Sequence, residues 1–528
     1  MGRLRWTLLV PVFFAGAWSD GNCAQWQVTP SLTLRQIFSD NINLDPDNEE
    51  SAWVTQISPG ISISRGQAGG LGGFGGGLGG FGGGQNRMPG RLALNLNYRQ
   101  QHLFSTQEGR TYDLFHQLQA NSTARLVDSV FLNARATAGQ TLVNPQGRQF
   151  AGNVVNVGNR ANFYTFGVTP YWLPHLGGYA DGRVLLDYYY VTTSGRAASA
   201  AHTYTQSAFL RSGKRFKILT WQIGFNNQRQ VRSGGDDVRF RNGIAVLNYR
   251  WTRTFSTFVQ GGFFDNDFRT TTNASNDGLF YTVGATWTPN RKLTLSAGGG
   301  RNSFASITFS PTRRTLLQGI YRRNNVGTLT GNVFMGLINH RTRHTVWQAR
   351  YTESVTTTQT VLAQRQVFQV VDEFGNPIVD PVTEQPALVA IDLPRLVDEV
   401  FIRRRADLSF TGNTAKTTFN ARVFVAKRNF QVSRDESKVL GINGSWNWRW
   451  GTRTSSVFQG WWQWSDFSRR QGQDSTNVFW LASVRLTRRL SRNVNASLEY
   501  RHQQQSSDGI AGRDYQENRA IASLNMRF

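Results

Sequence analysis

The sequence predicts an all-β protein, a single transmembrane antiparallel β-barrel of about 22 strands within a range of 20–24. Three observations predict this fold class. Apolar residues recur at every second position over long stretches, connections between these stretches alternate between short and long, and the composition combines many aromatic residues with many amides and hydroxyls. Each observation is typical of barrels that face lipid outside and water inside.

The stretch GINGSWNWRW, residues 441–450, shows the alternation most clearly. Trp446, Trp448 and Trp450 fall on one side of an extended chain, whereas Asn447 and Arg449 fall on the other. Side chains of a strand alternate between two faces, so a period of two predicts a strand with unlike surroundings on its faces. A soluble sandwich could supply these surroundings, and so could a membrane barrel.

The connections separate these two possibilities. Tight connections at 212–215, 251–254, 289–292 and 490–493 alternate with longer ones at 143–158, 194–201, 231–237, 269–277, 431–436 and 468–475. Barrels of the outer membrane have short periplasmic turns and longer extracellular loops. A soluble sandwich has no reason to keep this alternation.

Composition points the same way. Phe, Trp and Tyr number 35, 16 and 15, while only 39% of the chain is hydrophobic and its mean hydropathy is −0.41. The net charge is +25, but Lys and Arg are spread along the chain and no nucleic-acid-binding motif accompanies them. We therefore expect no nucleic-acid partner.

The N-terminus resembles a secretory signal peptide. Arg3 and Arg5 precede an apolar stretch, Trp6 to Trp18, that is too short to span a bilayer. Cleavage after Ala24 gives a signal peptide at 1–24 and a barrel at 25–528, and it removes Cys23, the single cysteine. No later stretch has the length and apolarity of a transmembrane helix.

Aromatic residues and the C-terminus mark the edges of the predicted membrane span. Four tryptophans precede tight turns and form a predicted membrane girdle: Trp172, Trp251, Trp287 and Trp450. Leu524, Met526 and Phe528 share one face of the last strand, the pattern that outer-membrane barrels present to the barrel-assembly machinery.

Two segments depart from the alternation. Residues 67–89 form a glycine-rich tract that we interpret as a loop insertion, and residues 368–396 form a long loop with clustered acids. Residues 292–324 fit either two strands or three. No plug domain precedes the first strand, so the lumen would hold water, folded-in loops or another protein.

Arginines on the inward side of the alternation are candidates for lining a pore, because a charge on the lipid face costs about 2–4 kcal/mol at the bilayer midplane. The candidates are Arg350, Arg403, Arg405, Arg422, Arg449, Arg485 and Arg501. Guanidinium groups along a pore would attract uronate or phosphate groups. The alternative is that they pair with Asp407, Glu353 and Glu499.

No arrangement of residues indicates catalysis, a cofactor or a metal. The seven histidines are scattered, and no Ser, His and acid spacing singles out a triad. The acidic stretch at 40–50 could hold calcium but lacks the glycine and terminal glutamate of an EF-hand loop, so an acidic turn is favoured. We expect no enzyme.

Several stretches resemble a known family. WQVTPSLTLRQIFSDNINL with ISPGISISRG, residues 339–359 and residues 393–412 are similar to the PEP-CTERM system-associated outer membrane proteins. The resemblance covers nearly the whole chain after residue 24, with 67–89 as an insertion. It implies an outer-membrane barrel of Gram-negative bacteria with exosortase sorting and exopolysaccharide production. It supplies no catalytic residues.

The sequence thus predicts a bacterial outer-membrane barrel, porin-like, that is a pore for export or passage of anionic polymer or solutes. The alternative is a loop-closed structural or docking barrel that anchors envelope polymer without transport. An outer-membrane enzyme and a soluble adhesin are weaker alternatives. Expected partners are outer-membrane lipid and lipopolysaccharide, the barrel-assembly machinery and, as a candidate, an anionic exopolysaccharide.

Overall fold

The structure is a computed structural model that describes residues 26–66, 91–107, 111–144, 147–155, 158–196, 198–270, 275–364, 396–470, 474–508 and 513–528. The predicted signal peptide, the glycine-rich tract at 67–89 and nearly all of the 368–396 loop lie outside these residues.

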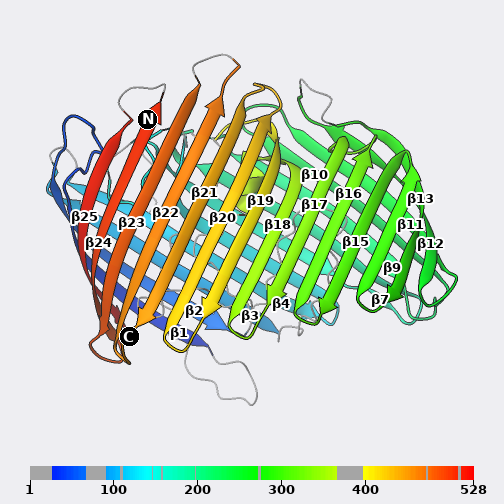
Figure 1. Cartoon of the computed structure of the whole chain (residues 1–528), viewed down its shortest axis with the longest axis horizontal. Helices are drawn as coiled ribbons and strands as arrows, with labels where there is room; N and C mark the ends of the chain where they lie inside the picture. The colour runs from blue at the N-terminus through cyan, green and yellow to red at the C-terminus, as the bar shows by residue number, and fades with distance from the viewer. Residues whose placement is uncertain are drawn as a thin grey trace.

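Twenty-four of the strands form a closed ring in which each strand pairs antiparallel with its neighbours in the chain, and β25 pairs with β1 (Figure 1). The remaining strand, the two-residue β7, adds only to the edge of β8. The strands are β1 (Gln27–Ser39), β2 (Ala52–Arg65), β3 (Leu92–Ser105), β4 (Tyr112–Val127), β5 (Val130–Leu142), β6 (Arg160–Trp172), β7 (His175–Leu176), β8 (Ala180–Thr193), β9 (Ala201–Ser212), β10 (Leu219–Arg232), β11 (Val238–Arg250), β12 (Phe255–Asp267), β13 (Gly278–Asn290), β14 (Leu293–Gly300), β15 (Asn302–Thr312), β16 (Thr315–Asn324), β17 (Gly331–Arg341), β18 (Thr345–Thr357), β19 (Val400–Asn413), β20 (Thr417–Phe430), β21 (Glu436–Arg449), β22 (Thr454–Ser468), β23 (Ser475–Arg489), β24 (Val494–Asp508) and β25 (Tyr515–Arg527).

The predicted fold class is therefore confirmed, and the strand count is 24 rather than about 22. The ambiguous stretch 292–324 holds three strands, β14, β15 and β16. The first of these, β14, has only eight residues and ends in Gly298, Gly299 and Gly300. Glycines carry no side chain, so the alternation that would identify this strand is missing from its second half.

Because strands alternate in direction, the connections fall at two ends. The short-turn end carries connections such as 291–292, 313–314 and 414–416, and it also holds the end of β25. The long-loop end carries, among others, 40–51, 143–159, 194–200 and 358–399. In Figure 1 the long-loop end is at the top and the C-terminus is at the bottom.

Two helical segments lie at the long-loop end, the 3-10 turn η1 (Ser194–Arg196) and α1 (Thr358–Ala363). The Thr357 side chain caps α1 by accepting a hydrogen bond from the backbone N–H of Thr360 at 3.2 Å. No helix in the described part of the chain is long and apolar enough to span a membrane.

The outer face of the wall is apolar. Ile442 and Trp446 of β21 and Trp450 just after it are exposed there, and the rings of Trp446, Trp448 and Trp450 stack with centroids 5.5 and 4.1 Å apart. Exposed Leu, Ile, Val and aromatic side chains of the other strands continue this surface around the barrel. An exposed apolar surface of this extent is one that a bilayer covers.

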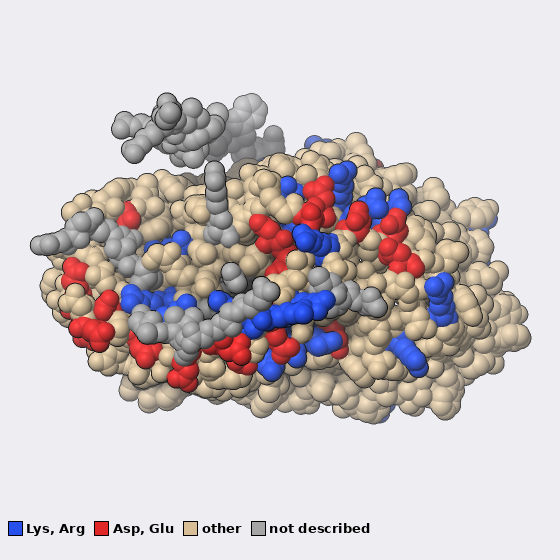
Figure 2. All heavy atoms as spheres, turned by 90° about the horizontal axis from the view of Figure 1, so that it is seen from above, with Lys and Arg blue, Asp and Glu red and all other residues tan. Residues whose placement is uncertain are grey.

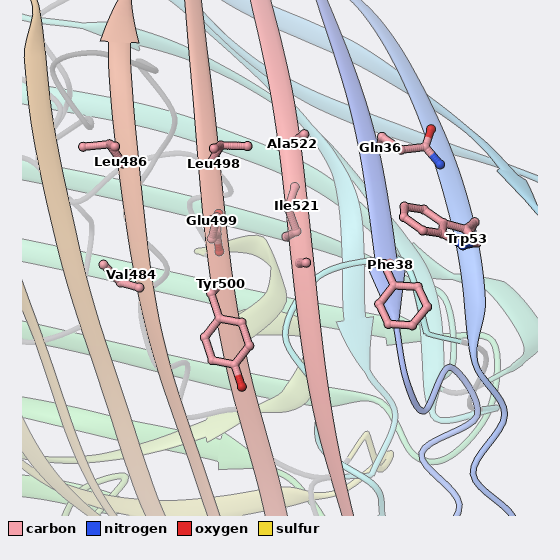
Figure 3. A pocket seen from close by; sticks show the side chains of 11 residues that line it. Gln36, Phe38, Trp53, Val484, Leu486, Leu498, Glu499, Tyr500, Ile521 and Ala522 are labelled. Atoms are coloured by element: carbon pink, nitrogen blue, oxygen red, sulfur yellow. The ribbon is translucent and has the colours of Figure 1, made fainter.

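Small residues on β25 shape this outer face where the barrel closes. Ala520 and Ala522 lie at the bottom of a shallow groove whose sides include Leu498 on β24 and Phe38 on β1. Figure 3 shows Leu498, Tyr500 and Phe38 on the outer side of the wall, while Glu499 lies on the other side. The alternation of one strand thus divides lipid-facing from interior side chains within a single residue step.

Candidate functional site: the interior of the barrel

The inner wall carries two clusters of arginines and acids. The first, which we call the β18–β20 cluster, comprises Arg350, Arg403, Arg405, Asp407 and Arg422. Asp407 accepts hydrogen bonds from Arg405 at 2.6 and 2.7 Å and from Arg422 at 3.1 and 2.5 Å. Arg350 faces Asp407 across the β18–β19 ladder, is exposed to the lumen and has no ion pair among the described residues. The cluster thus holds four guanidinium groups and one carboxylate, and Arg405 and Arg422 bind that carboxylate directly.

The second cluster, the β23–β25 cluster, comprises Arg485, Glu499, Arg501, Glu517 and Arg519. Arg485 and Arg501 donate to opposite oxygens of Glu499 at 2.7 and 2.6 Å. Arg519 donates to Glu517 at 2.7 Å, and these two side chains are almost fully buried. Gln503 also donates to Glu517 at 2.5 Å, and Ser39 of β1 contacts the same carboxylate, which ties the closing strands together.

The β23–β25 cluster is buried because the loop after β5 folds into the lumen and covers it. The backbone N–H of Gln149 donates to Gln505 at 2.7 Å, and that of Ala151 donates to Gln503 at 3.2 Å. The guanidinium of Arg519 donates to the carbonyl of Ala151 at 3.2 Å. We call residues 143–159 the inward loop.

Apolar packing holds the inward loop in place. Phe150, Ala151 and Val155 are buried together with Leu44 of the β1–β2 loop and Phe479 of β23. Burial of such side chains contributes about 1.5–3 kcal/mol each. The lumen therefore has its own small hydrophobic core at the long-loop end, built by loops rather than by a separate domain.

A second group of loop contacts lies at the same end. Leu362 of α1 and Leu396 pack against Tyr189 and Val191 of β8. Leu396 also donates its backbone N–H to the carbonyl of Val143 at 3.1 Å. Helix α1 follows β18, so these contacts join two parts of the wall that are far apart around the ring (Figure 1). Of the possible lumen contents that the sequence left open, the structure shows folded-in loops.

The predicted pore residues lie in different places. Arg350, Arg403, Arg405 and Arg422 form most of the β18–β20 cluster. Arg485 and Arg501 belong to the β23–β25 cluster. Arg449 lies at the short-turn end, where it donates to the carbonyl of Ala415 at 2.9 Å. The expected acids Asp407 and Glu499 do pair with these arginines.

Glu353, the third expected acid, pairs with none of the predicted pore arginines. It shares the outward side of β18 with Trp347 and Tyr351, and it pairs with Arg404 at 3.2 Å. Tyr351 donates its hydroxyl to the same carboxylate at 3.0 Å. This ion pair lies near the long-loop end of the outer face.

The predicted girdle tryptophans Trp172, Trp251, Trp287 and Trp450 are all exposed at the short-turn end. Three of them donate the indole N–H to hydroxyls: Trp172 to Ser129, Trp251 to Thr257 and Trp450 to Ser456, at 2.9 to 3.2 Å. Leu524 and Met526 lie on the outward side of β25, and Phe528 is exposed with its N–H bonded to the carbonyl of Pro30 at 3.0 Å.

A set of tyrosine–histidine pairs on the outer face of the β3–β4 and β8–β9 hairpins was not predicted from the sequence. It joins tyrosine hydroxyls to histidine rings: Tyr98 with His116, Tyr112 with His102 and Tyr188 with His202, at 2.9 to 3.0 Å. The sequence shows these histidines far apart, and only the register of neighbouring strands joins each to its tyrosine. Such rings suit the boundary between apolar chains and water.

The acidic stretch at 40–50 forms a turn. Asp45 accepts hydrogen bonds from the backbone N–H groups of Asp47 and Asn48, both at 3.1 Å, and lies 3.7 Å from Arg148 of the inward loop. The N–H groups of Asp47 and then Asn48 lower the pKa of Asp45. Among the described residues, no group of three or more His, Cys, Asp or Glu side chains could hold a metal ion.

Comparison with protein families gives no match, and comparison with curated proteins gives none either. Among solved structures, the chain is similar to the siderophore receptor PirA from Pseudomonas aeruginosa, with a TM-score of 0.40 and 10% identity over 95% of this chain and 80% of that one. PirA from Acinetobacter baumannii gives 0.42 and 9% over 94% and 80%. The FrpB iron transporter from Neisseria meningitidis gives 0.43 and 9% over 95% and 81%. These scores are too low to carry a substrate from those proteins to this chain.

The closed ring, the apolar outer face and the exposed tryptophans at the short-turn end define a large β-barrel of the outer-membrane type.

Proposed function

We propose that this barrel passes anionic polymer or solutes across the bacterial outer membrane, within an envelope system of the PEP-CTERM and exopolysaccharide kind. The signal-like N-terminus and the stretches that resemble the PEP-CTERM system-associated outer membrane proteins support this setting. In this orientation the short turns face the periplasm and the long loops face the exterior. The role is that of a conduit, without catalysis or a cofactor.

The observation that carries the proposal is the β18–β20 cluster. The cluster holds four arginines and one acid, Asp407, which pairs with Arg405 and Arg422, so arginines outnumber carboxylates within the cluster. Guanidinium groups bind carboxylate and phosphate oxygens in a bidentate manner, and the lower dielectric of a lumen strengthens this attraction relative to bulk water. Arg350, exposed and without an acidic partner in the described chain, offers the first contact.

A second function has its own supporting observation. The inward loop is fixed by hydrogen bonds from Gln149 and Ala151 and by a buried apolar core, which is more than a passive surface loop requires. A barrel closed in this way could anchor envelope polymer at its surface without transport.

Single-channel conductance of the refolded full chain in a planar bilayer, with reversal potential in a salt gradient, tests the two. Large anion-selective steps are expected for a conduit, and Arg350→Gln with Arg422→Gln should shift the reversal potential toward zero. Arg301→Gln with Arg323→Gln, two exposed arginines at the long-loop end, is the matched control and should leave it unchanged. Silence from a folded barrel, persisting after removal of the inward loop, would reject transport and leave the anchor.

A further inference from the structure

The short turns of the barrel carry a continuous series of positive charges. The eight turns from the one between β9 and β10 to the one between β23 and β24 each hold at least one Lys or Arg and hold no Asp or Glu. We call these twelve exposed side chains the basic rim: Lys214, Arg215, Lys217, Arg253, Arg291, Lys292, Arg313, Arg314, Arg343, Lys416, Arg453 and Arg492.

The basic rim holds twelve of the chain's 58 Lys and Arg residues, which the sequence shows only as cations dispersed along the chain. Every second connection of an up-and-down barrel lies at the same end, so residues dozens of positions apart in sequence meet on one rim. Lysines and arginines that look scattered in the sequence therefore lie together in the structure. The long-loop end differs, since acidic and basic side chains lie next to each other there (Figure 2).

A further set of arginines extends the positive charge of the short-turn end onto the inner face of the wall. Six arginines near the ends of strands at this end fall on the inner face of the wall by the alternation of the strand. They are Arg211, Arg250, Arg341, Arg449, Arg489 and Arg527. On β11, for example, Leu247 and Tyr249 are exposed on the outer face, so Arg250 falls on the inner face. On β21, Trp446 and Trp450 similarly place Arg449 inward.

This placement distinguishes two anionic partners. Lipid headgroups meet the outer face and would be served by outward cations, whereas a polymer that enters the lumen meets the inner face. Of the eight arginines at these strand ends, Arg488 lies on the outward side, next to Leu486 and Val484 in the alternation, and Arg65 lies outward on the face of Trp53 and Ile57. The inward majority favours a ligand in the mouth of the barrel.

Few acids neutralise this end. In the described part of the chain, Asp181 lies 3.8 Å from Arg211, and Asp128 pairs with Arg125 in the β4–β5 turn outside the basic rim. The turn between β6 and β8 holds no Lys or Arg. The rim is therefore an arc from β9 to β25, and it lies on the same side of the ring as the inward arginines of β18–β20.

We propose that the basic rim is a docking surface for an acidic polymer, one that carries a carboxylate or phosphate on many of its repeating units. This inference rests on the proposed function only for the direction of travel, from the rim into the lumen. A chain of like charges along a rim raises the local concentration of a polyanion, and several weak contacts on one polymer combine through effective concentration. The binding weakens with salt, because exposed charges are screened.

The test uses the full chain in nanodiscs of phosphatidylcholine, with a polyuronate oligosaccharide as the probe and neutral dextran of equal length as the reference. The rim variant carries Arg291→Gln, Lys292→Gln, Arg313→Gln and Arg314→Gln. The matched control removes the same charge at the long-loop end, with Arg301→Gln, Arg323→Gln, Arg434→Gln and Arg470→Gln. All eight side chains are exposed, so folding should be unaffected.

We expect the rim variant to bind polyuronate about ten-fold more weakly than the unchanged chain and the control variant to bind within about two-fold of it. Equal binding by the two variants would overturn the proposal. Unchanged polyuronate binding together with lost adhesion to phosphatidylglycerol vesicles would also overturn it and would assign the rim to lipid headgroups.

These outcomes are separate from those of the conductance experiment. Polyuronate binding to a silent barrel would retain the rim and reject the conduit. Anion-selective conductance without polyuronate binding would retain the conduit and reject the rim.

Discussion

The two ends of the barrel differ in the residues that their connections carry, although the same strands lead to both ends. At the long-loop end, the described residues of the inward loop and residues 396–399 fold inward and pack through Phe150, Val155 and Leu396. At the short-turn end, the eight turns of the basic rim span two to six residues and hold lysines and arginines, and none of these eight turns is long enough to cover the lumen. One end carries apolar packing between loops and wall, and the other carries positive charge.

The inward loop and the β18–β20 cluster are therefore separate elements that can be changed independently. The inward loop touches the β23–β25 cluster, whereas the β18–β20 cluster lies on another part of the wall. Variants at one end should therefore leave the property of the other end intact. The following expectations test that separation in order of effect.

The largest effect should come from replacing residues 144–158 with a short Gly-Ser linker. Removal of the hydrogen bonds from Gln149 and Ala151 and of the packing of Phe150 opens the lumen at the long-loop end. We expect conductance in planar bilayers to rise several-fold, with anion selectivity retained because the β18–β20 cluster is unchanged. Shortening the 213–218 turn at the opposite end is the control and should not raise conductance.

The next effect concerns stability. Glu517→Leu leaves the buried guanidinium of Arg519 without its carboxylate, and an uncompensated buried charge costs about 3–5 kcal/mol. The transition from folded to unfolded gel migration should move to a lower temperature. The double variant Glu517→Leu with Arg519→Leu removes both charges and should recover most of the loss. A double variant no more stable than the single one would contradict this account.

The sequence predicted the wall better than the interior, for a physical reason. Alternation is a local property, so Trp446, Trp448 and Trp450 reveal both the strand and its two faces. The contacts of Gln149 with Gln505 and of Ser39 with Glu517 join residues hundreds of positions apart, and no local pattern encodes them. A signal did exist, since Phe150, Val154 and Val155 are apolar residues in a connection that otherwise reads as an exposed loop.

Charge illustrates the same limit. Arg291, Arg313 and Arg343 look dispersed along the chain, and only the topology brings them to one rim. The predicted tight turns and the predicted Trp girdle lie at that rim, so a count of charges per turn, rather than per stretch of sequence, would have revealed it. Strand β14 is the opposite case. It is a local element, but its glycines lack the side chains by which the alternation would have identified it.

A smaller effect is expected at the outer face of the short-turn end. Trp448→Leu removes the stacking of Trp448 on Trp450, whose ring centroids lie 4.1 Å apart, and on Trp446. Each aromatic pair contributes about 0.5–1.5 kcal/mol beyond area burial, so we expect a loss of about 1–2 kcal/mol. Leu408→Ala, an exposed residue of β19, is the control and should cost less. Conductance should be unchanged in both, since neither side chain faces the lumen.

The smallest expected effect is that acid pH loosens the contact between the β1–β2 turn and the inward loop at the long-loop end. The backbone N–H groups of Asp47 and Asn48 lower the pKa of Asp45 below its ordinary value of 3.8, so ionised Asp45 stabilises the β1–β2 turn, and Arg148 of the inward loop lies 3.7 Å away. A lowered pKa means that this stabilisation is present above the ordinary value and is lost as the pH falls through the lowered one. Channel openings should therefore become more frequent below about pH 4. Asp45→Asn should show frequent openings at neutral pH and no further change in acid, whereas Asp277→Asn, in a loop far from Arg148, should behave like the unchanged chain. Identical pH profiles for Asp45→Asn and the unchanged chain would show that the β1–β2 turn does not control the frequency of channel openings.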